Sequence, residues 1–216
     1  MKILPADQHF KEEVANTFTH GLGLIFSIVA LVVLIVYSSM KGTTLHVVSC
    51  TIFGSSLVLL YLASSLYHAV SHVHLKNHLF RRLDHICIYF LIAGTYTPFA
   101  LLALRGPSGW TIFAVVWFLA IAGTFFKIFW GARYPFLSIL GYILMGWVVI
   151  FAIKPLVLNL ALGGLILLVL GGLFYTVGCY FYLKDEKICY FHALWHIMVM
   201  IGSLCHFLSV FFYLIP

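Results

Sequence analysis

The feature that most constrains this chain is a series of long apolar stretches separated by short polar breaks. A helix needs about 20 apolar residues to cross a hydrocarbon core of roughly 30 Å. Hydrophobic residues make up 63% of the 216 residues and charged residues 8%, whereas soluble domains contain about 45–50% and about 25%. We therefore predict an all-α integral membrane protein, with residues 1–216 forming a single domain, a seven-transmembrane helix bundle. The predicted spans run from Thr17 to Ser39, Leu45 to Val70, Leu83 to Leu104, Trp110 to Trp130, Tyr134 to Ile153, Leu158 to Leu183 and Ile188 to Leu214.

The positive charges predict the orientation of this bundle. An odd number of spans puts the amino terminus on the same side as the second-to-third, fourth-to-fifth and sixth-to-seventh connections. That side holds nine cations and the opposite side three. Because cations concentrate in cytoplasmic loops, we expect a cytoplasmic amino terminus, with residues 1–16 as a short cytoplasmic segment, and a carboxyl terminus outside. The nine cations are Lys2, Lys11, Lys76, Arg81, Arg82, Lys127, Arg133, Lys184 and Lys187, and the three are Lys41, Arg105 and Lys154.

Glycines recur in the sixth predicted span at intervals that place them on one face of a helix. They are Gly163, Gly164, Gly171 and Gly172. Small residues let neighbouring membrane helices approach closely. We interpret this stripe as a helix-packing surface.

Ionisable side chains within the predicted spans gather at one depth, near the cytoplasmic ends. His68 lies near the end of the second span, Asp84 at the start of the third, and His192 and His196 in the opening turns of the seventh. His20 lies near the start of the first span. Ionisable groups are costly in a bilayer and usually face the interior of a bundle, so their convergence indicates a functional site.

The stretch "HALWH" places two imidazoles on one helical face, because His192 and His196 are four residues apart. Together with His68 they supply three neutral imidazoles, the ligand set of an open tetrahedral zinc site. We predict that Asp84 takes a proton from the attacking water. Ser64, one turn before His68, either donates to an oxyanion or orients a ligand.

Other interpretations of these residues stay open. Intramembrane histidines also serve as hydrogen-bond partners or proton relays, two histidines can hold haem, and imidazole also suits copper, iron and nickel. In "LYHAVSHVHLKNH", the pairs His68 and His72 or His74 and His78 form a competing metal site, although the later ones fall in a loop. Cys189 is either a fourth ligand or a small apolar filler.

Three motifs carry a family resemblance over essentially the whole chain. They are "EVANTFTHGLG", "SSLYH" followed by "RRLDHICIYFLIAGTYTP", and "HALWH". By these motifs the chain resembles the hemolysin III-type membrane proteins, the bacterial branch of the progestin and adipoQ receptor family, which are similar to the alkaline ceramidases. The family pattern Ser-x3-His, Asp and His-x3-His falls on Ser64, His68, Asp84, His192 and His196.

The resemblance implies a Zn2+ cofactor held by His68, His192 and His196 on the cytoplasmic side, with Asp84 and Ser64 serving a zinc-bound water. It also implies a multi-pass protein of the bacterial plasma membrane. We therefore expect a zinc-dependent hydrolase that cleaves an amide or ester bond in a membrane lipid or lipid-derived substrate and contributes to membrane lipid homeostasis.

The first motif adds Glu13, Asn16 and His20 at the cytoplasmic mouth, where we expect them to support the metal ligands or anchor the helix. A simpler interpretation makes Asn16 the N-cap of the first helix, with Glu13 just upstream.

Two other functions compete with the enzyme. One is a membrane pore or hemolysin-like channel, and the other is a non-catalytic membrane sensor with a structural zinc, which normally has four protein ligands. We expect no nucleic-acid partner, because the cations are thinly spread and form no basic stripe.

Overall fold

The computed structural model describes residues 6–71, 78–131 and 133–216, and within these ranges every regular element is helical. Seven segments are long and apolar enough to cross a membrane, so the predicted all-α, seven-helix membrane bundle is confirmed. The helices are α1 (Ala6–Lys41), α2 (Thr44–Ser71), α3 (His78–Pro98) continued by the π-helix η1 (Phe99–Leu104), α4 (Gly106–Phe129), α5 (Pro135–Gly146) continued by the 3-10 helix η2 (Val148–Ala152) and α6 (Ile153–Asn159), α7 (Leu162–Lys184) and α8 (Phe191–Tyr213).

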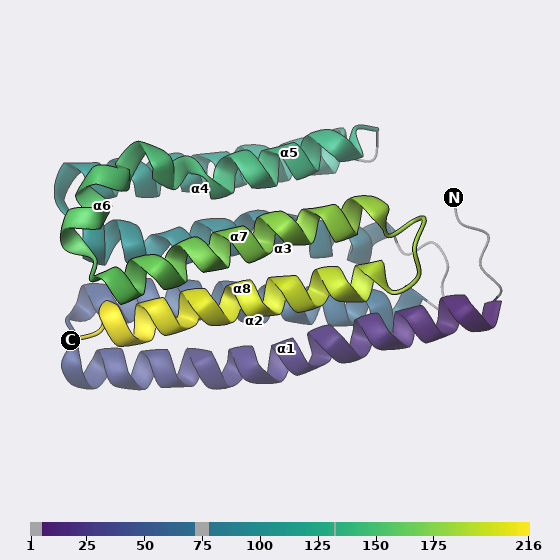
Figure 1. The fold of residues 1–216 in the computed structure, drawn as a ribbon, viewed down its shortest axis with the longest axis horizontal. Coiled ribbons are helices and arrows are strands. Elements are labelled where there is room, and N and C mark those ends of the chain that lie inside the picture. Colours follow the sequence, from purple (N-terminus) through teal and green to yellow (C-terminus); the bar gives the residue numbers. More distant parts are fainter. Residues whose placement is uncertain (1–5, 72–77, 132) are drawn as a thin grey trace.

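Helices that follow one another along the chain pack side by side, and α8 closes the bundle by packing against both α7 and α1 (Figure 1). The third span, α3 with η1, is the most buried of the seven. α1 begins at one end of the bundle and α8 finishes at the other, as an odd number of spans requires (Figure 1). The ends of α2 and α7 and the starts of α1, α3 and α8 therefore lie at the same end.

The first helix is longer than its apolar stretch. α1 begins at Ala6, so residues 6–16 are helical and continue directly into the first span. The N-cap interpretation of Asn16 is wrong, because this side chain lies inside α1 and is buried. Hydropathy marks only the part of a helix that can face lipid, and the polar first turns of α1 are held by contacts that the sequence pattern does not reveal.

The third and fifth spans are irregular where the chain contains Pro98 and Gly146. Pro98 has no N–H to donate, and α3 passes there into the wider turns of η1. The fifth span was predicted as one run but breaks after Gly146, and Tyr96 compensates for the break. Its hydroxyl donates to the Gly146 carbonyl at 2.7 Å and accepts from the Val149 N–H at 2.8 Å, which satisfies backbone groups that lipid could not.

The glycine stripe of α7 packs as predicted at three of its four positions. A Cβ added at Gly171 would clash with the imidazole of His206 on α8, and one added at Gly163 or Gly164 would meet Tyr213. Gly172 differs, because a Cβ there would meet no atom within 4 Å.

Four residues used in the sequence analysis lie outside the described residues. They are Lys2, His72, His74 and Lys76.

Candidate metal centre

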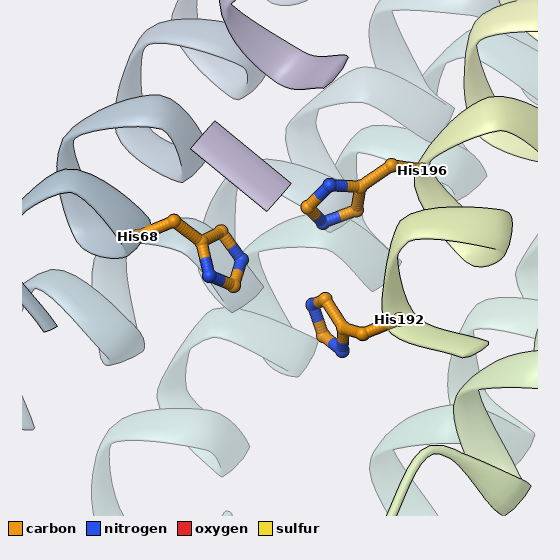
Figure 2. Close-up of side chains that lie close together, drawn as sticks. All are labelled: His68, His192 and His196. Carbon is orange, nitrogen blue, oxygen red and sulfur yellow. The ribbon is translucent and has the colours of Figure 1, made fainter. Parts of the chain in front are cut away.

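Three histidines from two helices point their rings toward one another (Figure 2). His68 comes from the last turn of α2, and His192 and His196 come from the first two turns of α8. One ring nitrogen of each residue lies within 4.8 Å of those of the other two, so this cluster can hold a metal ion. Two nitrogens about 2.0–2.1 Å from a tetrahedral zinc are about 3.3 Å apart, a spacing that small side-chain rotations reach.

The ring of His68 is held by the first helix. Its Nδ1 lies 2.8 Å from Glu13 Oε2, and the Ser71 hydroxyl donates to the same carboxylate oxygen. An ionised carboxylate only accepts hydrogen bonds, so Nδ1 of His68 carries the proton. The Nε2 of His68 is then a lone-pair donor, and it is buried without a hydrogen-bond partner among the described residues.

The ring of His192 is held by a residue just after α7. Its Nδ1 lies 2.7 Å from Asp185 Oδ2. By the same reasoning as for His68, the carboxylate accepts from Nδ1–H and leaves the Nε2 lone pair of His192 for a metal ion.

The ring of His196 contacts the hydroxyl of Thr19, with 3.0 Å between Nδ1 and Oγ1. That hydroxyl donates its single hydrogen to the Ala15 or Asn16 carbonyl of its own helix. It must therefore accept from Nδ1–H of His196. All three rings have their protonated Nδ1 engaged, and this is the arrangement that directs three Nε2 lone pairs at one cation.

A cavity of about 180 Å3 begins beside this cluster and extends between α3, α5, α6, α7 and α8. One water molecule needs only about 10–15 Å3, so the cavity has room for a much larger ligand. Its lining includes His20, Ser64, Asp84, His192 and His196, and most of its lining surface is apolar. His68 belongs to the three-histidine cluster but is not among the residues that line the cavity.

Asp84 and Ser64 line the same cavity as His192 and His196. Among the described residues the set of mutually close ligand atoms comprises only the three histidines, so Asp84 lies outside the ligand set. Ser64 is fully buried, and its hydroxyl makes no hydrogen bond within the described part of the chain. Its donor is therefore available to a ligand in the cavity.

The first motif also reaches the cluster. Glu13 contacts His68, as described above, and His20 stacks on His196. Asn16 is buried nearby in α1, and its Oδ1 and both ring nitrogens of His20 make no hydrogen bond in the described ranges. Unpaired buried polar atoms are costly, so their concentration beside the three rings is compatible with a polar ligand in the cavity.

Sequence reasoning missed Asp185 and gave Thr19 no role. Asp185 follows the last residue of α7 and precedes His192 by seven residues, so no short motif joins them. Cys189 is not a metal ligand in the cluster, and its Sγ instead accepts a hydrogen bond from Gln8 Nε2 at 2.8 Å.

Comparison with known proteins gives the family. Residues 8–207 match the family described as Haemolysin-III related. The chain is 50% identical over 215 residues to "Hemolysin-3" of Bacillus cereus, covering 100% of this chain and 97% of that protein. It is 48% identical over 203 residues to "Hemolysin-3 homolog" of Bacillus subtilis (strain 168), covering 94% of each. It is 28% identical over 221 residues to human "Monocyte to macrophage differentiation factor", covering 97% of this chain and 89% of that protein.

The resemblance seen in the motifs is therefore confirmed, and this multi-pass bacterial membrane protein belongs to the Haemolysin-III related family.

Proposed function

We propose that the protein is a zinc-dependent hydrolase that cleaves an amide or ester bond in a lipid. The observation that carries the proposal is the continuity between the polar cluster and the apolar cavity, which suits a substrate with a polar head and an acyl tail. When bound to the three imidazoles, zinc supplies a Lewis acid for a carbonyl and lowers the pKa of water.

The residues around the cavity supply the remaining chemistry. Asp84 takes the proton of the water that attacks the carbonyl carbon, and then gives this proton to the leaving nitrogen or oxygen as the bond to the acyl carbon breaks. Ser64 donates its hydrogen bond to the carbonyl oxygen as negative charge develops there. The apolar lining holds the acyl tail and keeps bulk water from it.

The small ligand set favours catalysis over a structural role for the metal. A structural zinc normally has all four positions filled by protein, whereas the cluster found in the described residues comprises three side chains. The names of the bacterial relatives refer to haemolysis, and a pore is therefore the outcome that competes with the enzyme.

The test combines metal content with lipid hydrolysis. Purified full-length protein should contain about one zinc per chain, with three imidazoles as ligands, and should release fatty acid from a lipid amide or ester. His192→Ala should lose both properties, and Asp84→Asn should keep the metal and lose hydrolysis. Metal retained by His192→Ala would contradict the site. Dye release from liposomes that persists in His68→Ala, His192→Ala and His196→Ala, without hydrolysis by the wild type, would favour the pore.

A further inference from the structure

The loop between α7 and α8 carries a carboxylate in contact with the three-histidine cluster. Asp185 Oδ2 lies 2.7 Å from Nδ1 of His192, and the two side chains are 20% and 23% exposed. The contact is therefore mostly shielded from water. Three residues separate Asp185 from Cys189, and this loop lies outside the three family motifs.

The position of this loop is fixed at both ends. At its start, the N–H groups of Lys187 and Ile188 donate to the Lys184 carbonyl at 2.9 Å and 3.1 Å. At its end, Tyr190 adopts a left-handed backbone conformation with φ 62°, which is uncommon for a residue other than glycine. In this conformation the Tyr190 N–H donates to Glu12 Oε1 at 3.0 Å.

The first helix secures the loop at a second point. Gln8 Nε2 donates to Cys189 Sγ at 2.8 Å. Gln8 and Glu12 are four residues apart and thus lie on the same face of α1. The first turns of α1 therefore hold the end of the loop that leads directly into His192, while the start of the loop presents Asp185 to the same residue.

The contact decides which nitrogen of His192 carries the proton. If the proton were on Nε2, that N–H would replace the lone pair that a metal ion needs, and Nδ1 and the Asp185 carboxylate would face each other as two acceptors. With the proton on Nδ1 both groups are satisfied, and Nε2 is free to bind a cation.

We propose that Asp185 is a positioning residue that sets the tautomer and ring orientation of His192 and thereby the affinity of the cluster for a divalent transition-metal ion. The inference rests on the metal-binding part of the proposed function and is independent of hydrolysis. Glu13 occupies the equivalent place on His68, so two carboxylates from opposite ends of the sequence act on two of the three rings.

The experiment compares four variants of the full-length protein purified in detergent. They are Asp185→Ala, Asp185→Asn, Asp185→Glu and, as a matched control, Glu186→Ala, which removes the exposed acidic side chain next to Asp185. The dissociation constant for zinc is measured by competition with a chelator of known affinity, and the ligand field is followed by the visible absorption of the cobalt(II)-substituted protein.

Asp185→Ala and Asp185→Asn should weaken zinc binding by about 10–100-fold, the usual effect of losing the partner of a ligand histidine. They should also alter the cobalt(II) absorption. Asp185→Glu restores the acceptor and should recover most of the affinity, and Glu186→Ala should bind like the wild type. The helix content of every variant is checked by circular dichroism. Asp185→Asn keeps the shape of the side chain, so it still tests the inference if Asp185→Ala does not fold.

Wild-type zinc affinity in both Asp185→Ala and Asp185→Asn would overturn the inference. An equal loss of zinc affinity in Glu186→Ala would also overturn it, because any loss of negative charge from the loop would then have the same effect. Failure of this inference can be distinguished from failure of the proposed function. A wild-type protein that binds zinc, loses affinity in Asp185→Asn and hydrolyses no lipid would support the positioning role and contradict the hydrolase.

Discussion

The imidazole of His20 lies flat against that of His196, with 3.5 Å between ring centroids and 17° between ring planes. Tyr61 meets the His20 ring edge-on, with 5.0 Å between centroids. His20 is buried, and neither of its ring nitrogens makes a hydrogen bond among the described residues. Its contribution within the chain is therefore a packed surface that limits rotation of a metal-binding ring.

We predict that His20→Ala weakens zinc binding, because it removes the surface that supports His196. The expected loss is about tenfold, the lower end of the range for residues that support a metal ligand. His20→Phe keeps an aromatic surface at this position and should retain the affinity. Titration of the purified variants with zinc and a competing chelator measures both effects, and wild-type affinity in His20→Ala would contradict the packing role.

Two adjacent glycines of α7 should respond in opposite ways to alanine. Gly171→Ala forces its methyl group against the His206 imidazole, and overpacking of this kind costs about 1–3 kcal/mol. Gly172→Ala adds its methyl group in open space and should be neutral or stabilise the helix by up to about 1 kcal/mol. Thermal unfolding in detergent should therefore show a lower midpoint for Gly171→Ala only. Equal midpoints would argue against close packing between α7 and α8.

A larger side chain at Gly172 should block the cavity. Gly172 lines the cavity and has open space around it, so Gly172→Leu places a branched apolar group where we propose that the acyl tail binds. Overfilling the site should cost about 1–3 kcal/mol, or roughly 5-fold to 150-fold weaker binding of a fluorescent long-chain fatty acid. The zinc content should not change.

The control for this substitution is Val177→Leu, on the exposed surface of the same helix. It should leave both fatty-acid binding and zinc content unchanged. Unaltered fatty-acid binding in Gly172→Leu would mean that the tail does not occupy this cavity.

The orientation of the bundle can be tested with a reporter enzyme that is active only outside the cytoplasm. The order of the spans in the sequence assigns nine cations to the side of the amino terminus and three to the other, and cytoplasmic loops carry the excess of positive charge. Alkaline phosphatase fused after Pro216 should therefore be active, and the same enzyme fused before Met1 should be inactive. The reverse pattern would place the three histidines at the outer surface.

The amino-acid sequence alone predicted the seven spans and the gathering of histidines at one end of the bundle. Hydropathy reports the length of each apolar stretch directly, and a spacing of four residues puts His192 and His196 on one face of any helix. The same local rules failed where a helix is not apolar or not regular. They did not predict the polar first turns of α1 or the break after Gly146 that Tyr96 stabilises.

Only the tertiary structure decided how the rings are held. Glu13, Thr19 and Asp185 each contact the Nδ1 atom of a different histidine, and two of these three pairs join residues more than fifty positions apart. Such contacts depend on how helices pack and on where a loop returns to the bundle, which no periodic pattern in the chain encodes. Hydropathy and helical spacing therefore determined which side chains reach this end of the bundle, whereas packing between α1, α2, α7 and α8 decided which nitrogen of each ring is free to bind a metal ion.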